Sequence, residues 1–122
     1  MSKPLLVCVV DDDESVRESL PDLLKEFGYS TQVFSSAEAF LRSKYLNRTK
    51  CLILDVAMPG MSGPDLKREL EHRKLHIPII FITARTDMGR GSEDVKGAVA
   101  CLTKPFGDNA LQTALRRALK KT

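Results

Sequence analysis

The chain has 122 residues, and it contains no tryptophan and few aromatic residues, which make up 6% of it. It also has no apolar run close to the ~20 residues that a membrane-spanning helix requires, so we expect no contact with a membrane. The apolar run near the start, residues 5–10, is too short for the core of a signal peptide. These absences together predict a cytoplasmic protein.

Cysteine is scarce, with three residues, Cys8, Cys51 and Cys101. None of them lies in the closely spaced pairs that zinc sites use. Each sits within a short apolar run, so we expect all three to pack as small hydrophobic side chains. An odd number of cysteines without a signal peptide is consistent with a reducing compartment.

Charge of one sign does not dominate the chain, whose formal net charge is +3. This mild excess of cations does not by itself indicate nucleic-acid binding. The late cations Arg116, Arg117, Lys120 and Lys121 fall in the last turns of a predicted helix, where positive charge suits the helix dipole. The length predicts a single domain over residues 1–122, and no internal repeat, linker or low-complexity stretch is visible.

What the sequence does contain is a regular alternation of strand and helix patterns. Five apolar runs are predicted as strands: residues 5–10, 31–34, 51–54, 79–82 and 99–102. Helical spacing of apolar residues separates most of them. Strands that alternate with helices predict an α/β fold, a doubly wound parallel sheet with helices on both faces.

Helix boundaries are marked by capping residues and by proline or glycine. Ser35 and Glu38 predict a capping box at the start of a short helix, Pro64 a helix start, and Asp108 or Asn109 the cap of the last helix. The segment 86–97 is the least regular, because Gly89, Gly91 and Gly97 disfavour a helix there. We expect a shortened or irregular helix in it.

Charged and polar residues gather where the predicted strands end. The first strand is followed by Asp11 and Asp12, the third ends in Asp55, the fourth in Thr83, and the fifth near Lys104. In an open parallel sheet the carboxyl ends of the strands form the ligand-binding edge. Each of these residues alone could be a helix cap or an ion-pair partner, but the set on four strand ends predicts a functional site.

The chemistry of this set favours phosphoryl transfer. Clustered carboxylates repel one another unless a cation neutralises them, and Mg²⁺ prefers a few carboxylates, waters and a phosphate. A carboxylate beside such an ion can act as a nucleophile and form an acyl phosphate. The lysine ammonium and the threonine hydroxyl could position and neutralise the phosphoryl oxygens.

The chain resembles the response-regulator receiver (CheY-like) domain of two-component systems over essentially its whole length. The matching stretches are residues 10–17 (VDDDESVR), 54–63 (LDVAMPGMSG), 81–84 (FITA) and 102–106 (LTKPF). Residues 36–41 (SAEAFL) are similar to receivers of the FixJ-like group, which precede a LuxR-type output domain. The resemblance implies a flavodoxin-like sheet of five strands in the order 2-1-3-4-5.

The resemblance also implies roles for the residues at the strand ends. Asp55 would be the phosphoacceptor. Thr83 and Lys104 would contact the phosphoryl group that it carries. The metal would be Mg²⁺ or Mn²⁺. Asp55, Asp12 and the backbone carbonyl of Ala57 would bind it, Asp12 by direct contact, and Asp11 would bind it largely through water.

Conformational switching would involve Thr83 and Phe106, and the peptide bond before Pro105 would be cis. Such a domain is a signalling protein rather than an enzyme, because it catalyses only its own phosphorylation and dephosphorylation. Its partner would be a sensor histidine kinase, and it could form a phosphorylation-dependent homodimer. It would act on DNA, in transcription regulation, only through an output domain that this chain lacks.

Three features depart from the family pattern. Ala57 has no polar side chain to orient water, Phe106 lacks the hydroxyl of a tyrosine, and the glycine-rich segment 86–97 lies where the family forms its output surface. Partner binding and switching are therefore the functions that the sequence leaves open.

Three alternatives to a phosphorylated receiver remain. A haloacid-dehalogenase enzyme would need an aspartate where Ala57 stands, and a larger chain. A flavodoxin-like electron carrier would need a phosphate-binding loop where residues 11–13 are acidic. A pseudo-receiver that binds proteins without being phosphorylated is the alternative closest to the main hypothesis.

Overall fold

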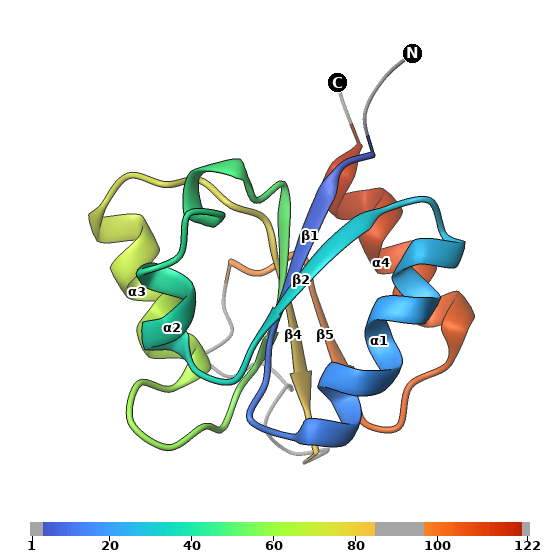
Figure 1. The fold of residues 1–122 in the computed structure, drawn as a ribbon, viewed down its shortest axis with the longest axis horizontal. Coiled ribbons are helices and arrows are strands. Elements are labelled where there is room, and N and C mark those ends of the chain that lie inside the picture. The colour runs from blue at the N-terminus through green and yellow to red at the C-terminus, as the bar shows by residue number, and fades with distance from the viewer. Residues whose placement is uncertain (1–3, 85–96, 121–122) are drawn as a thin grey trace.

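The computed structural model describes residues 4–84 and 97–120. The irregular helix predicted over residues 86–97 therefore falls, apart from Gly97, outside the described residues. Within them the chain forms one parallel sheet between two layers of helices (Figure 1).

Five strands of four or five residues make the sheet. They are β1 (Leu6–Val10), β2 (Ser30–Phe34), β3 (Cys51–Asp55), β4 (Ile79–Thr83) and β5 (Ala100–Thr103). All neighbouring pairs are parallel, in the order β2-β1-β3-β4-β5. The predicted fold class and strand order are confirmed, and the predicted strand ends differ from the observed ones by one residue or so.

The central strands are buried on both faces, which explains their continuous apolar sequences. Cys8, Leu52 and Phe81 belong to the cluster on one face, and Val9 and Ile53 to the cluster on the other. Successive side chains of a strand point to opposite faces of the sheet, so each short apolar run contributes to the hydrophobic clusters on both faces. Cys8 and Cys51 are fully buried, as predicted, whereas Cys101 is half-buried.

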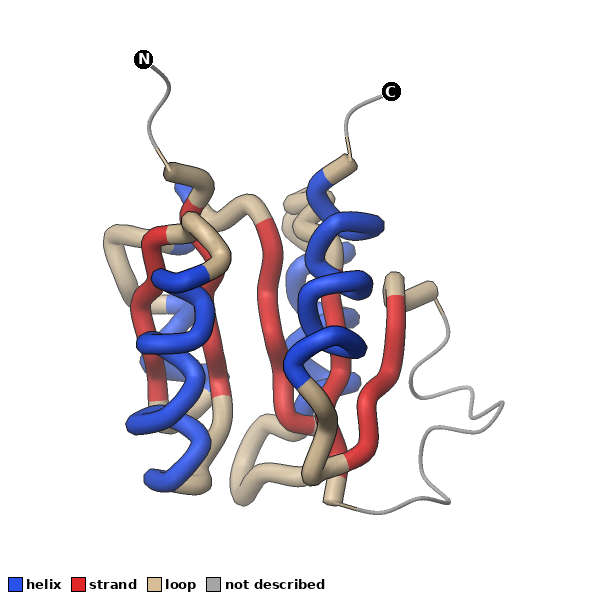
Figure 2. Tube along the Cα trace, turned by 90° about the vertical axis from the view of Figure 1, so that its right-hand side faces the viewer, coloured by secondary structure: helices blue, strands red, loops and turns tan. Residues whose placement is uncertain are grey.

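Among the residues that the structure describes, two α-helices lie on each face of the sheet. α2 (Ala37–Leu41) and α3 (Gly63–His72) lie on one side of the sheet, and α1 (Glu14–Glu26) and α4 (Asp108–Leu119) on the other (Figure 1). In the view of Figure 2, α1 and α4 lie side by side in front of the strands. A short 3₁₀ helix, η1 (Leu46–Arg48), precedes β3. Each of the four α-helices buries at least two residues against the sheet.

Two predicted caps were wrong. α2 is capped by Ser36, whose hydroxyl accepts the N–H of Ala39 at 3.1 Å, so Ser35 and Glu38 form no capping box. α4 begins after Gly107 with no side-chain cap. At α2, two serines precede the helix, and the backbone path sets which one reaches the free N–H groups. At α4, the two predicted caps, Asp108 and Asn109, lie within the helix itself. The helix predicted to start near Pro64 is confirmed, behind a capping box of Ser62 and Asp65.

The strand order reverses between β1 and β3, since the chain first moves from β1 to β2 at one edge and then returns to β3 on the other side. The loops after β1 and β3 therefore lead away to opposite faces and leave a crevice between them. This is the position at which doubly wound sheets bind ligands.

Candidate functional site

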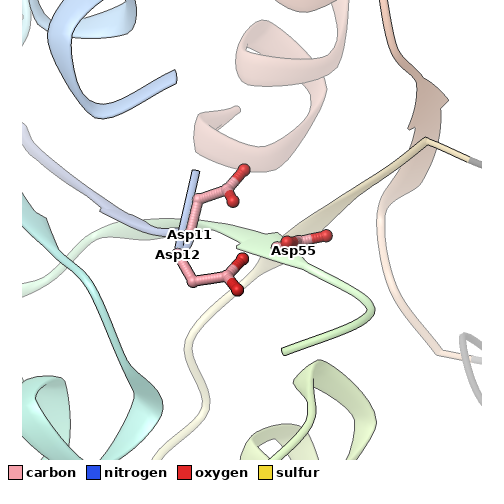
Figure 3. Close-up of side chains that lie close together, drawn as sticks. All are labelled: Asp11, Asp12 and Asp55. Atoms are coloured by element: carbon pink, nitrogen blue, oxygen red, sulfur yellow. The ribbon is translucent and has the colours of Figure 1, made fainter. Parts of the chain in front are cut away.

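Three aspartates from two adjacent strands meet at this crevice. Asp11 and Asp12 follow β1, and Asp55 ends β3 (Figure 3). One carboxylate oxygen of each lies within 4.8 Å of the others. Asp11 is completely buried and Asp55 is 6% exposed, whereas Asp12 faces solvent. The sequence predicted this cluster, and the parallel register of β1 and β3 produces it.

Backbone and side-chain contacts hold the β1–α1 loop in place. The N–H of Asp11 donates to the carbonyl of Phe34 at 3.1 Å, and Asp11 Oδ1 accepts the N–H of Asp13 at 2.9 Å. Asp13 in turn caps α1 by accepting the N–H of Ser15. Arg17 donates from Nη1 to the Asp11 carbonyl at 2.9 Å. One oxygen of Asp11 is thus used within the loop, and the other is directed into the site.

Lys104 supplies the cation of the site. Its Nζ lies 2.9 Å from Asp11 Oδ2 and 4.0 Å from Asp55 Oδ2, and its side chain is only 19% exposed. The contact with Asp11 is an ion pair without good hydrogen-bond direction, because among the described residues Asp11 Oδ2 has no hydrogen-bond partner. Within the described part of the chain, one ammonium faces three carboxylates, which leaves an excess of negative charge at the crevice.

This excess acts on the phosphoacceptor candidate. Burial above all, and the negative charge of Asp11, raise the pKa of Asp55 from 3.8 to about 7. The ammonium of Lys104 and the N–H of Ala57, 3.4 Å from Asp55 Oδ1, act in the opposite direction. Burial acts to lower the pKa of Lys104, but the carboxylates of Asp11 and Asp55 have the larger combined effect. The pKa of Lys104 is therefore raised. The site is therefore poised to accept a further cation.

The other predicted residues lie around this centre. Thr83 ends β4 and is 2% exposed, and its carbonyl accepts the N–H of Lys104 at 2.7 Å. Ala57 is exposed directly after the strand that carries Asp55. The peptide bond between Lys104 and Pro105 is cis. Phe106 is half-buried against the core on the α1 and α4 side, where it borders an open groove with residues of α1.

Sequence patterns did not reveal three residues that shape the site. Besides Arg17, these are Gly63 and Glu38. A Cβ atom on Gly63 would lie 2.3 Å from the carbonyl oxygen of Asp55, so only glycine fits beside the end of β3. The carboxylate of Glu38 accepts the N–H of Met61 at 3.3 Å, across 23 residues. Such contacts leave no local signal, because they depend on which loops the fold brings together.

Comparison with known proteins assigns the family. The model of the response regulator receiver domain matches residues 7–116. The chain belongs to this family. It is therefore a receiver domain of two-component response regulators, as the sequence motifs predicted.

Curated relatives of this receiver are longer proteins. The chain is 43% identical to the response regulator protein TodT of Pseudomonas putida over 94% of its own length and 51% of that protein. It is 42% identical to nodulation protein W of Bradyrhizobium diazoefficiens over 98% of its own length and 53% of that protein. It is 40% identical to the transcriptional regulatory protein FixJ of Azorhizobium caulinodans over 100% of its own length and 58% of that protein. This identity confirms the predicted likeness to the FixJ group. The chain thus spans about half the length of these relatives.

Solved structures agree with this assignment. The FixJ-N crystal structure superposes with a TM-score of 0.84 at 38% identity, covering 100% of this chain and 98% of that one. TrrA from Thermotoga maritima, solved in complex with Mg²⁺-BeF, gives a TM-score of 0.84 at 29% identity, with coverage of 93% and 98%. In residues 4–84 and 97–120, no helix of the receiver is long and apolar enough to cross a membrane.

Proposed function

We propose that this receiver accepts a phosphoryl group on Asp55 in a reaction that requires Mg²⁺ or Mn²⁺, and that the phosphorylated form controls an output domain or partner. The observation that carries the proposal is the position of Asp55 beside both Asp11 and Lys104. A carboxylate that lies next to other acids, and within 4.0 Å of an ammonium, has the neighbours that a phosphoacceptor requires.

The residues present fit a divalent metal ion. Asp11 Oδ2 is buried without a hydrogen bond among the described residues, and carboxylate oxygens of Asp12 and Asp55 lie within 4.8 Å. Hard oxygen ligands at one open crevice are the type that Mg²⁺ prefers. Asp12 and Asp55 would bind the ion directly, Asp11 largely through water, and Ala57 through its backbone carbonyl. The bound ion would neutralise charge on the carboxylates and on the phosphoryl oxygens.

The Asp55 carboxylate then acts as the nucleophile. One of its oxygens attacks phosphorus, a P–O bond forms, and the P–N bond to the histidine of the donor kinase breaks. The imidazole leaves with the bonding electron pair and takes a proton from solvent. The Lys104 ammonium is close enough to pair with the phosphoryl oxygens, and the hydroxyl of Thr83 would donate to one of them. The TrrA complex with Mg²⁺-BeF supports this arrangement by similarity.

Phosphorylation by acetyl phosphate tests the proposal. Wild-type protein should gain the mass of one phosphoryl group when Mg²⁺ is present and should not gain it in EDTA. Asp55→Asn should gain none, since an amide is a poor nucleophile. Incorporation in Asp55→Asn equal to that of the wild type would place the acceptor elsewhere. Absence of incorporation in the wild type would favour the pseudo-receiver alternative.

The physiological partner in this proposal is a sensor histidine kinase. The similarity to the transcriptional regulatory protein FixJ supports an output in transcription regulation, on DNA through a separate domain. The proposal also includes a switch through Thr83 and Phe106 and a phosphorylation-dependent homodimer. We also retain the cytoplasmic location and the single domain of residues 1–122 as parts of the proposal.

A further inference from the structure

Glu38 connects α2 to the loop that follows the phosphoacceptor strand. Its Oε2 atom accepts the N–H of Met61 at 3.3 Å. The same oxygen lies 3.1 Å from the place where a Cβ atom on Gly60 would stand. Gly60 has a positive φ of 74°, so the chain turns sharply at the point where the carboxylate meets it.

The loop, residues 56–62, is fixed at both ends. The N–H of Val56 donates to Ile82 at 3.0 Å, and the N–H of Gly63 donates back to the Val56 carbonyl at 3.0 Å. Between these anchors Ala57, Pro59 and Gly60 are exposed. Met58 lies between these exposed residues and is buried in the core, and Met61 packs partly against the same cluster. Glu38 adds to this packing a polar restraint on the backbone of residues 60 and 61.

α2 provides a rigid base for this restraint. Ala37 and Phe40, on either side of Glu38, are completely buried in the core. Ser36 caps the helix, so the first turn has a defined orientation. A carboxylate on a fixed helix can set the position of a loop that lacks its own secondary structure.

We propose that Glu38 is a positioning residue for the phosphorylation site. By holding residues 60 and 61, its carboxylate keeps the backbone of Ala57 beside Asp55, where Ala57 donates to Asp55 Oδ1 and would offer its carbonyl to the metal. This inference rests on the proposed phosphorylation of Asp55. It predicts that Glu38 governs the apparent affinity for Mg²⁺ rather than the rate at saturating Mg²⁺.

Glu38→Ala and Glu38→Gln separate a positional effect from an effect of charge. Alanine removes the acceptor, whereas glutamine keeps a carbonyl oxygen at the same reach and loses only the charge. Glu38→Ala should weaken Mg²⁺ binding about threefold to tenfold, as expected for loss of one hydrogen bond of ordinary net strength. Glu38→Gln should stay within about twofold of the wild type. Glu69→Ala, which removes a carboxylate paired with Arg73 on α3, is the matched control and should leave the affinity unchanged.

Two readouts are needed. The shift of the unfolding temperature with Mg²⁺ gives the affinity without any phosphoryl donor, and the rate of phosphorylation by acetyl phosphate at low and saturating Mg²⁺ gives the kinetic effect. Glu38→Ala should phosphorylate slowly at low Mg²⁺ and at the wild-type rate at saturation. Gly60→Ala approaches the same contact from the loop and should weaken Mg²⁺ binding as well, so the inference can be tested even if Glu38→Ala folds poorly.

The outcomes distinguish the two proposals. A wild type that shows no Mg²⁺ shift and no phosphorylation would overturn the proposed function, and this inference with it. A wild type that is phosphorylated, with Glu38→Ala indistinguishable from it, would overturn the inference alone. Equal losses in Glu38→Gln and Glu38→Ala would also overturn it, because charge and not position would then be the cause. Wild-type Mg²⁺ affinity in a folded Gly60→Ala protein would exclude the loop as the intermediary.

Discussion

The Nζ atom of Lys104 lies 2.9 Å from Asp11 Oδ2, closer than the 4.0 Å that separates it from Asp55 Oδ2. In the unphosphorylated protein the lysine therefore pairs mainly with the buried acid of β1. A phosphoryl group on Asp55 would compete for the same ammonium. On the proposed phosphorylation of Asp55, this competition would convert added charge into movement of the chain after β5.

Lys104→Ala should uncouple phosphorylation from this movement. The variant should still be phosphorylated on Asp55 but should show only part of the amide chemical-shift changes that the wild type shows with beryllium fluoride. Without metal it should also lose about 1–3 kcal/mol of stability, because Asp11 would remain buried without its cation. Arg73→Ala, which breaks an exposed pair with Glu69, is the control and should cost about 0.5 kcal/mol or less. A full wild-type shift pattern in Lys104→Ala would contradict the coupling role.

The raised pKa of Asp55 predicts how stability changes with pH. In the folded protein without metal the pKa is about 7, whereas the ordinary value is 3.8. The folded state therefore holds this proton more tightly than the unfolded state. The resulting stabilisation is complete below the ordinary pKa of 3.8 and is lost as the pH rises through the folded-state pKa of about 7. Asp55→Asn removes the titration and should lack this loss.

Urea denaturation in EDTA measures the effect. Between pH values of about 5 and about 8, the wild type should lose on the order of 2 kcal/mol relative to Asp55→Asn. The comparison cancels the titration of the shared groups that do not interact with Asp55. A difference between the two proteins that does not vary with pH would show that Asp55 titrates normally.

Asp12→Ala tests the metal ligands. Mg²⁺ should raise the unfolding temperature of the wild type, since a ligand that binds only the folded state stabilises it. The variant should lose most of this shift while keeping its fold, because the side chain of Asp12 is exposed. Asp22→Ala removes another exposed acid, on α1, and should keep the full shift. Equal shifts in Asp12→Ala and the wild type would rule Asp12 out as a ligand.

Position 57 should set the lifetime of the acyl phosphate. The exposed Ala57 offers no group to orient an attacking water. Ala57→Asn and Ala57→Glu should therefore change the rate of dephosphorylation without preventing phosphorylation, which decay of the phosphorylated mass after removal of the donor would show. An unchanged decay rate in both variants would exclude position 57 from hydrolysis.

Gly63→Ala should disturb both the fold and the site. The added Cβ would lie 2.3 Å from the Asp55 carbonyl oxygen and 3.0 Å from a ring carbon of Phe81. We expect a loss of about 3 kcal/mol and slower phosphorylation, because the end of β3 must move. Gly107→Ala is the control: nothing lies within 4 Å of its added Cβ, and the cost should stay near about 0.5 kcal/mol. Chemical denaturation compares the two, and equal stabilities would contradict the close packing of Gly63.

Sequence alone determined the architecture and the composition of the acidic site. The alternation of short apolar runs with helical patterns is a local property, and it predicted a doubly wound parallel sheet. The polar residues that end these runs must then meet at one edge, because parallel strands place their carboxyl ends together. For this reason Asp11, Asp12, Asp55 and Lys104 could be grouped before any coordinates were known.

Only the tertiary structure decided how these groups are paired and supported. Spacing along the chain does not tell whether Lys104 lies nearer to Asp11 or to Asp55, since that depends on the course of the chain after β5. The role of Glu38 was assigned wrongly for a similar reason: a serine three residues earlier suggested a capping box, whereas the carboxylate binds Met61, which is distant in sequence. Local patterns report local hydrogen bonds, and contacts between loops are set by the packing of the helices and strands that carry them.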